Sequence, residues 1–591
     1  MRLRLLSCEW YRLIRLAFRF AIGGLLMVPS WALAQTQSIP GSVEPGRIEQ
    51  EFQPPPGPAP TPEVISPQIP EAVTPSEAAR IRFTLRQVVV DGSTVYSHEQ
   101  LKALYGDFLG RDVSLADVYG IADAITTKYR SDGYVLSRAV VPAQRIVDGE
   151  VHITVVEGFI DRVIIQGEES AALRSYANRL TRSQPLTADD LQRYLLLIND
   201  LPGTRARGIL APAPGVLGGS ELTIVVESKR TDFTVALDDR GSKYIGPLQL
   251  FSEAAVNDPT GSADRLALRY VTTPVDEEEV RYFELGYGAP IGADGLKFSL
   301  SASGNLSQPG STLQTAFLRT EASGETVTGR LSYPVVRSRA ENLLVDVSFT
   351  LRNSILDQFS LPSETRLVSS YEDRIRVLRG GVNYDATDAW EGRDFVRFEL
   401  SRGLPIFNST PGGRVVGASR SGGQSQFWKA TIDASRLQPL NGLTPGMGLL
   451  TALSAGGSFG QQLLASEQFG VGGAQYGRGY DPSEITGDFG GAGKAELQYS
   501  FSLDIAQERP VLQAYTFYDF GLVADANARM VNQPAGSRTL ASTGLGVRIS
   551  LENRFLANLE LAQALTRSVS AFADSTDRRP LRAYFSLVVA F

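Results

Sequence analysis

Residues 496–505, ELQYSFSLDI, alternate strictly between polar and apolar side chains. Because successive side chains of an extended strand point to opposite faces, this stretch predicts a strand with one apolar face and one polar face. Residues 345–352, VDVSFTLR, and residues 545–551, LGVRISL, repeat the pattern. From about position 230 to position 591 this period of two replaces the period of a helix, so we expect a region of about 360 residues built from strands.

The length of this region decides between a soluble β-sandwich and a membrane barrel, since both alternate. A helix-free region of this size is too long for a typical single sandwich, whereas a closed barrel pairs every backbone group within lipid. At about 20 to 24 residues per strand and connection, the region holds on the order of 16 antiparallel strands. The sequence therefore predicts an all-β transmembrane barrel over residues 230–591.

The chain ends inside a predicted strand. The last apolar face of that strand consists of Ala583, Phe585, Leu587, Val589 and Phe591. The aromatic Phe591 at the C-terminus resembles the terminal-strand signal that the outer-membrane barrel assembly machinery reads. We therefore expect that machinery and outer-membrane lipid among the partners of this chain.

The first 34 residues have the pattern of a secretory signal peptide. Five arginines precede the apolar stretch 20–33, which ends in the small-residue pattern Ala32-Leu33-Ala34. A membrane anchor helix is the alternative, but this stretch is shorter than the roughly 20 residues that span a bilayer. We expect a signal peptide over 1–34 that is cleaved before Gln35.

Composition excludes several classes of function. The single cysteine, Cys8, leaves with the signal peptide, which excludes disulfides, cysteine-bound metals and cysteine nucleophiles in the mature chain. Without the five arginines and one glutamate of that peptide, 52 basic and 63 acidic side chains remain, a net charge of −11. An acidic balance argues against a nucleic-acid partner. The mature chain also has no run of 18 apolar residues that would predict a transmembrane helix.

Residues 35–80 are rich in proline, with Pro54-Pro55-Pro56 near the centre. Such a run forms no packed core and favours an extended polyproline conformation, so we interpret it as a linker. Just before the proline run, residues 44–52 could form a short helix that plugs the barrel.

A unit of strand, two helices and two strands occurs twice between residues 81 and 229. In the first copy, over 81–157, a strand is expected at 83–90, and Ser114-x-x-Asp117 is a helix capping signature ahead of an apolar stripe. In the second copy, over 158–229, Thr187-x-x-Asp190 has the same role. The repeat predicts two small α+β domains of the order β-α-α-β-β.

Short motifs along the whole mature chain resemble those of one family, the outer-membrane transporters of two-partner secretion systems. They are, in order, Gly133-Tyr134, Val141–Gln144, Asp148–Glu150, Asn199–Gly203, Tyr333-Pro334, Arg337–Arg339, Asn342-Leu343, Ser401–Leu404, Ser466–Phe469 and Gly472-Gly473. The resemblance implies that the two repeats are POTRA domains in the periplasm of a Gram-negative bacterium. It also implies a barrel that exports a secreted partner protein, with an N-terminal secretion domain, without ATP.

The resemblance further implies a lid loop around 470–492 that folds into the barrel and carries Gly477-Arg478-Gly479-Tyr480 at its tip. The usual first residue of that motif is Val or Ile, and the departure to Gly477 is expected to loosen the tip. The partner motif Phe-x-Asp-x-Gly occurs as Phe517, Asp519 and Gly521, which the period of two places on one face of a strand. In this family that face is the lumen.

An arginine inside a barrel needs an acceptor, and one aspartate can accept both arms of its fork. Removing either partner would leave a charge that costs about 3 to 5 kcal/mol in a dry site. A water-filled lumen would reduce that cost. The alternative is that Arg478 is one of many lumen arginines and Asp519 an ordinary strand residue.

The sequence offers no catalytic or metal-binding constellation and no cofactor motif, so we expect neither an enzyme nor a cofactor. POTRA sheets with a free edge are expected to bind the client as an added strand. The rival functions are an insertase of the same superfamily, a solute porin and an outer-membrane enzyme. Two POTRA-like repeats, the proline-rich extension and the segment Asn199–Gly203 favour the secretion transporter over the insertase. The repeats count against a porin, and the missing nucleophile and metal constellation counts against an enzyme.

Overall fold

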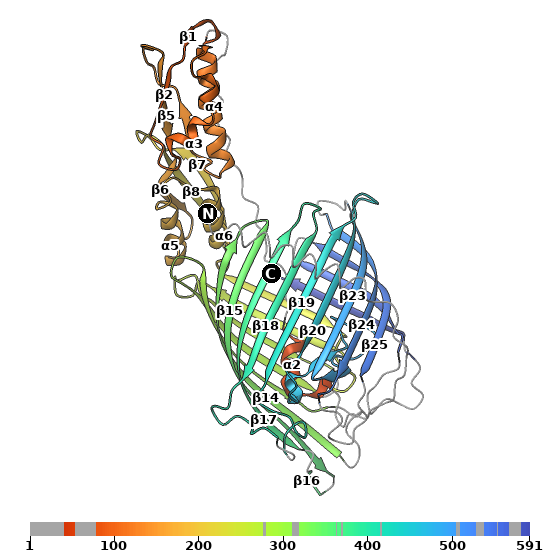
Figure 1. Cartoon of the computed structure of the whole chain (residues 1–591). Helices are drawn as coiled ribbons and strands as arrows, with labels where there is room; N and C mark the ends of the chain where they lie inside the picture. The colour runs from red at the N-terminus through yellow and green to blue at the C-terminus, as the bar shows by residue number, and fades with distance from the viewer. Residues whose placement is uncertain are drawn as a thin grey trace.

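The computed structural model describes residues 41–53, 78–275, 279–309, 318–361, 363–367, 370–413, 417–503, 509–526, 537–551, 554–566, 579 and 581–591. The expected signal peptide over 1–34 and most of the proline-rich linker lie outside the described residues. Figure 1 shows the described chain as a narrow tower that stands on one rim of a tilted β-barrel.

The barrel closes through sixteen strands in the described part of the chain, each antiparallel to its neighbours, as the sequence predicts. The strands are β9 Thr231–Asp238, β10 Gln249–Asn257, β11 Arg265–Thr272, β12 Val280–Ile291, β13 Leu296–Ser307, β14 Leu318–Arg337, β15 Glu341–Ser360, β17 Tyr371–Thr387, β18 Arg393–Gly403, β19 Trp428–Pro439, β20 Met447–Ser458, β23 Phe489–Ser502, β24 Val511–Ala524, β25 Arg538–Leu551, β26 Phe555–Ala564 and β27 Leu581–Ala590. The two-residue strand β16, Thr365–Arg366, pairs antiparallel with the last two residues of β15.

The last strand closes the barrel against the first. Strand β27 pairs with β9 in a register that sets Ser586 opposite Asp238 and Ala590 opposite Thr234. The C-terminal residue continues this seam, because the backbone N–H of Phe591 donates to the carbonyl of Phe233 at 2.8 Å. The seam therefore includes the final residue of the chain.

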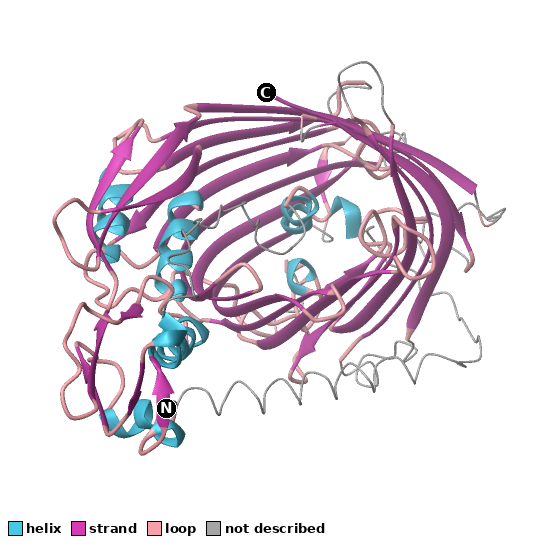
Figure 2. Ribbon diagram, turned by 90° about the horizontal axis from the view of Figure 1, so that it is seen from above, coloured by secondary structure: helices cyan, strands magenta, loops and turns pink. Residues whose placement is uncertain are grey.

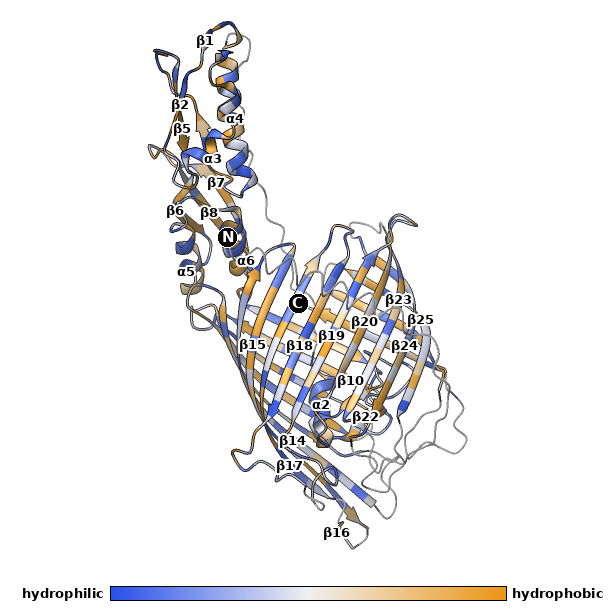
Figure 3. Cartoon of the chain, in the orientation of Figure 1, coloured by the Kyte–Doolittle hydropathy of each residue, from blue (hydrophilic) through white to orange (hydrophobic). Residues whose placement is uncertain are grey.

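The two faces of each strand differ as their alternation predicts. On β15 the polar side chains Asp346, Ser348 and Arg352 are buried inside the barrel, whereas Val347 on the other face is 55% exposed. Figure 3 shows apolar residues along the length of the barrel strands. An apolar outer face and a polar lumen are the pattern of a barrel embedded in lipid.

No helix among the described residues is long and apolar enough to cross a membrane.

The outer half of the tower is the first repeat. It contains η2 Ala78–Arg80, β1 Arg82–Thr84, β2 Gln87–Asp91, α3 His98–Lys102, η3 Gly106–Phe108, β3 Asp112–Ser114, α4 Leu115–Ser131, β4 Arg138–Val140 and β5 Glu150–Val156. Its sheet has the order β2-β5-β4, while β1 pairs separately with β3. The capping box forms as predicted, since the backbone N–H of Ser114 donates to Asp117 and the Ser114 hydroxyl accepts from the Asp117 N–H.

The continuous strand expected at 83–90 is wrong in one respect, because the chain divides it at Leu85 and Arg86. The N–H of Leu85 donates to the carbonyl of Arg111, and the N–H of Arg86 donates to the carbonyl of Gly149. The two halves therefore have different partners. The alternation of side chains does not reveal this change of partner.

The inner half of the tower is the second repeat, next to the barrel rim. It contains β6 Phe159–Gln166, α5 Ala171–Leu180, α6 Ala188–Asn199, β7 Thr204–Pro212 and β8 Gly219–Ser228, with the sheet order β6-β8-β7. Its helices pack on one face of the sheet around Tyr176, Leu195 and Ile198. Both repeats thus have the predicted α+β composition.

Two separate segments occupy the lumen, and Figure 2 shows their short helices inside the ring of strands. The first is η1 Gly41–Val43 with α2 Pro45–Glu51, which we call the plug helix. The second is the connection from β20 to β23, residues 459–488, which we call the lid loop. It contains η4 Ala465–Glu467, β21 Phe469–Val471 and β22 Ile485–Gly487.

Candidate functional site

The lid loop enters the lumen as a small hairpin. Strand β21 pairs antiparallel with β22, so that Val471 lies opposite Ile485. Both side chains are buried against Val523 and Leu540 of the barrel wall. Apolar packing therefore anchors the hairpin to the wall independently of the ion pairs at its tip.

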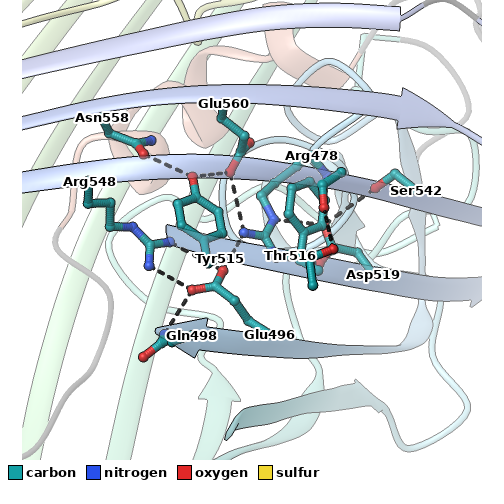
Figure 4. Close-up of polar contacts among 12 residues, drawn as sticks. Arg478, Glu496, Gln498, Tyr515, Thr516, Asp519, Ser542, Arg548, Asn558 and Glu560 are labelled. Carbon is teal, nitrogen blue, oxygen red and sulfur yellow. Dashed lines mark hydrogen bonds and ion pairs between the residues drawn. The ribbon is translucent and has the colours of Figure 1, made fainter. Parts of the chain in front are cut away.

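The tip of the lid loop is held by one arginine (Figure 4). The Arg478 guanidinium donates to both carboxylate oxygens of Asp519, from Nε at 3.0 Å and from Nη2 at 2.9 Å. The backbone N–H groups of Gly477 and Arg478 also donate to Asp519, at 3.2 Å and 3.0 Å. One wall carboxylate thus accepts four hydrogen bonds from the tip.

Two further carboxylates contact the same arginine. Its Nη1 donates to Glu496 on β23 at 2.6 Å and lies 3.4 Å from Glu560 on β26. Glu496 in turn pairs with Arg548 at 2.6 Å, and Glu560 with Arg240 at 3.0 Å. We call the group of Arg478, Asp519, Glu496 and Glu560 the lid lock.

The sequence reasoning missed Glu496 and Glu560. Glu496 stands in the alternating stretch that predicts the barrel, on the polar face, so its position in the lumen could have been inferred. Glu560 could not, because β26 comes near the lid tip only through the register of β24, β25 and β26 around the wall.

The lid lock is buried. The side chains of Arg478, Asp519, Glu496 and Glu560 are between 0 and 4% exposed. This burial argues against the weakening of the pair that a water-filled lumen would cause. In a buried site each unpaired charge has a large desolvation cost, so the contacts of the arginine are strongly interdependent.

Each position of the wall motif has a separate physical reason. The ring of Phe517 lies under the Arg478 guanidinium, with the guanidinium carbon 3.4 Å from the ring centre. Asp519 accepts the fork. At Gly521 a Cβ would lie 2.3 Å from a methyl group of Val471, so only glycine leaves room for the lid hairpin.

The glycines of the tip permit a close approach to the wall. Gly477 has φ of +87°, a conformation that Val and Ile avoid. A Cβ on Gly479 would lie 2.9 Å from the backbone nitrogen of Ala564. Tyr480 then ends the tip with its hydroxyl 2.7 Å from the carbonyl oxygen of Thr566, and it accepts from the Thr566 N–H at 2.9 Å.

The plug helix contacts the lid loop directly. Arg47 donates to the carbonyl of Gln468 at 2.8 Å and to that of Ala465 at 3.1 Å. Gln50 donates to the carbonyl of Ser466 at 3.1 Å. Side chains of the plug helix therefore satisfy backbone carbonyls around η4 of the lid loop.

Arg352 on β15 joins the plug helix to the lid loop from the wall. It donates to Glu49 of the plug helix at 3.1 Å and lies 3.6 Å from Glu467 of the lid loop. Glu467 is 1% exposed and also pairs with Arg379 at 2.7 Å and Lys429 at 2.6 Å. The plug helix and the lid loop therefore share one buried ionic cluster.

The two segments leave a cavity of about 510 Å³ in the lumen. Plug residues Arg47 and Glu51 line one side of it, and lid residues Phe469 and Tyr476 line another. Among the described residues, no group of three His, Cys, Asp or Glu side chains is placed to hold a metal ion. The polar contacts of this site are ion pairs and hydrogen bonds, which can hold a passage closed and release it.

Comparison with known proteins shows which family this chain resembles. The model of the family described as haemolysin secretion/activation protein ShlB/FhaC/HecB matches residues 218–549, and a ShlB-type POTRA domain matches residues 83–158. The heme/hemopexin transporter protein HuxB of Haemophilus influenzae strain 86-028NP is 24% identical, over 98% of this chain and 98% of that protein.

Two solved structures share the fold. CdiB from Escherichia coli superimposes with a TM-score of 0.70 at 21% identity and covers 88% of this chain and 93% of its own. CdiB from Acinetobacter baumannii gives a TM-score of 0.60 at 15% identity, over 99% of this chain and 98% of its own. These matches extend over both the tower and the barrel.

Proposed function

The chain belongs to the ShlB/FhaC/HecB family of haemolysin secretion/activation proteins, and from that premise we propose that it exports one secreted partner protein from the periplasm to the cell surface. The barrel lies in the outer membrane of a Gram-negative bacterium, and the POTRA tower lies in the periplasm. The partner is a large exoprotein with an N-terminal secretion domain. Barrel assembly machinery and outer-membrane lipid are the partners of the transporter's own biogenesis.

The observation that carries this proposal is the double closure of the lumen by two segments that are far apart in the sequence. The plug helix and the lid loop occupy the lumen and are fastened to its wall through Arg352 and through Arg478. A passage closed by ionic contacts can open for a polypeptide and close again without ATP. We assign Gly477, Arg478, Gly479 and Tyr480 to the lid-loop motif, with Phe517, Asp519 and Gly521 as its partner motif on the lumen wall.

The tower supports recognition of an extended client. In the first repeat β4 ends the sheet order β2-β5-β4, and in the second β7 ends the order β6-β8-β7. An end strand can pair with a segment of another chain, whose alternate side chains then give specificity. The client is thus captured as a strand before it reaches the barrel.

Export is tested by expressing the chain in a Gram-negative host together with a candidate partner encoded beside its gene. We expect the partner on the cell surface or in the medium, accessible to added protease, only when the transporter is present. Without the transporter, the partner should remain in the periplasm.

The same strain separates the rival functions. An insertase would change the amount of other heat-modifiable barrels in the outer membrane, and a porin would change the uptake of small solutes. A partner that stays periplasmic in the presence of a correctly folded transporter, with either of those changes, would refute the export function.

A further inference from the structure

The periplasmic rim of the barrel has an irregular strand directly under the second repeat. The register of β14 on β15 shifts between Pro334, opposite Leu344, and Val336, opposite Leu343, so Val335 is an extra residue in a β-bulge. A bulge interrupts the ladder, and its backbone carbonyls then need other donors.

The donor for this bulge comes from the tower. Arg193 of α6 donates to the carbonyl of Pro334 at 2.8 Å and to that of Val335 at 3.3 Å. The same guanidinium donates to the carbonyl of Asp294, in the turn between β12 and β13, at 3.3 Å. One arginine of the tower therefore donates hydrogen bonds to backbone carbonyls of both the bulge and a neighbouring periplasmic turn.

A second contact runs in the opposite direction. Arg337, at the end of the bulged strand, donates to both carboxylate oxygens of Asp200 in the tower, at 2.8 Å and 2.7 Å. Its remaining Nη1 donates to Asn342 at 2.9 Å, and Asn342 donates to Asp385 on β17 at 2.8 Å. The Arg337 side chain is 4% exposed with the tower in place, and its bond to Asn342 orients it from the barrel side.

Apolar packing and a third polar contact complete the junction. The hydroxyl of Tyr194 on α6 donates to the Asp294 carboxylate at 2.9 Å. A Cβ on Gly295 would lie 2.7 Å from a methyl group of Leu197 and 2.7 Å from the Pro334 ring. Helix α6 therefore lies tightly against the turn and the bulge together.

This junction borders a space between the tower and the barrel. A cavity of about 430 Å³ lies there, lined by Tyr176, Leu197 and Leu201 of the tower and by Lys297, Phe395 and Arg397 of the barrel. Under the export function proposed above, a client strand that leaves the tower would pass this point on its way into the barrel. The angle of the tower over the rim thus determines whether the cavity is aligned with the lumen.

We propose that the bulge of Pro334–Arg337 is a docking socket that fixes the second repeat over the periplasmic mouth, with Arg193 and Asp200 as its positioning residues. The socket explains why the motifs around Asn199–Gly203 and Tyr333–Asn342 occur in one chain, since they meet at this junction. Its role in delivery rests on the export function proposed above, whereas its role in holding the tower does not.

The test measures the position of the tower in the full mature chain without any client. The mature sequence has no cysteine once the signal peptide is removed, so spin labels at Ala211→Cys on β7 and Leu443→Cys on a periplasmic turn are specific. In lipid nanodiscs we expect one narrow distance distribution for the parent. Arg193→Ala and Asp200→Asn should each lower the ratio of docked to undocked tower by about fivefold, which corresponds to roughly 1 kcal/mol.

The matched control is Arg162→Ala, which breaks the pair with Glu221 on the exposed face of the same repeat. It should leave the distribution narrow. The double variant Asp200→Arg with Arg337→Asp exchanges the two charges. It should give a narrow distance distribution, whereas either single change should broaden it. Heat-modifiable mobility in gels shows that each barrel is folded.

Export of the partner is measured for the same variants. Broad distance distributions in these variants, together with reduced export, support the role of the bulge as a docking socket. Distributions as narrow as that of the parent in both Arg193→Ala and Asp200→Asn would overturn it, and so would full export by a chain whose tower has lost its fixed position. The distance measurement involves no client, so a failure of the proposed export function leaves it unchanged.

Discussion

Val471 of the lid loop lies where a side chain at Gly521 would be, since a Cβ on Gly521 would be 2.3 Å from the Val471 Cγ1 atom. The absence of a side chain on the wall is thus matched to a branched side chain on the lid. This pair makes the seating of the lid hairpin depend on the size of one residue on β24.

Gly521→Ala should therefore displace the lid hairpin from the wall. Overpacking of a well-packed site costs about 1 to 3 kcal/mol. We expect larger single-channel conductance in planar bilayers, while heat-modifiable mobility shows an intact barrel. The double variant Gly521→Ala with Val471→Ala restores the space and should return the conductance toward that of the parent. Equal conductance for parent and single variant would contradict the packing argument.

Arg478→Ala should open the lid more than Asp519→Ala. Removing the arginine breaks the ion pair of Asp519 and takes one partner each from Glu496 and Glu560, which keep Arg548 and Arg240. Asp519→Ala leaves Arg478 with two partners. Breaking a buried pair costs about 3 to 5 kcal/mol. The mobility of a spin label on the lid tip measures the opening, and exported partner measures function. If Asp519→Ala frees the tip as much as Arg478→Ala, the other two carboxylates have no part in the lock.

Arg352→Ala should release the plug helix and loosen the lid loop in one step. Arg352 contacts Glu49 of the plug helix and Glu467 of the lid loop, and both carboxylates are nearly fully buried. Protease cleavage within residues 41–53 reports release of the plug, and a label in the lid loop reports the second effect. The control is Arg374→Ala, whose guanidinium pairs with Glu372 on the same strand. A plug as protected as in the parent would argue against the shared cluster.

Phe591→Ala should lower the amount of assembled barrel without weakening the finished seam. The side chain of Phe591 is 67% exposed, while its backbone N–H and carbonyl hold Phe233 and Lys229. Alanine keeps those backbone bonds, so a loss of assembled protein would reflect reading of the aromatic residue during biogenesis. The unfolding temperature of the purified barrel serves as the control and should be unchanged. A normal yield in the membrane would remove Phe591 from the assembly signal.

Glu157 should make the first repeat sensitive to acid. Burial raises the pKa of this carboxyl, but hydrogen bonds from the Thr94 hydroxyl and backbone, the Val95 N–H and the Tyr129 hydroxyl outweigh burial and lower it below its usual value. A lowered folded-state pKa stabilises the fold above the unfolded-state pKa, and the contribution is lost as the pH falls through the folded-state pKa.

Hydrogen exchange of the Thr94 and Val95 amides checks this sign. Glu157→Gln should reduce their protection at pH 7, and the difference from the parent should shrink toward pH 3. Protection that is equal at pH 7 would show that the carboxylate does not hold this turn.

Most of the architecture could be predicted because it depends on local periodicity. The alternation around Leu497 and Val347 predicts the barrel, and the capping pairs at Ser114 and Thr187 predict the two helices that define the repeats. The division of the first strand at Leu85 was missed, since a strand keeps its alternation when it changes partner. Local pattern carries no information about which neighbour a strand selects.

Contacts between distant parts of the chain could be predicted only where a motif linked them. Arg478 and Asp519 were paired through two motifs, whereas Glu560 joins them through the register of three strands. The contact of Arg337 with Asp200 spans 137 positions in the sequence. Both motifs can be recognised in the sequence, but their contact depends on the position of the tower relative to the barrel.

The length of α2, seven residues, has a thermodynamic consequence for gating by the plug helix. Helices below about 12 residues are marginal in water, so this segment keeps its shape only while the wall and the lid surround it. Its departure is therefore a melting event, and the chain freedom it regains, about 1 to 2 kcal/mol per residue for the backbone, offsets part of the free energy of the ion pairs and hydrogen bonds that break. The segment remains covalently linked to the tower, so its return is an intramolecular refolding reaction. Its effective concentration is set by the length of the linker and does not depend on the protein concentration.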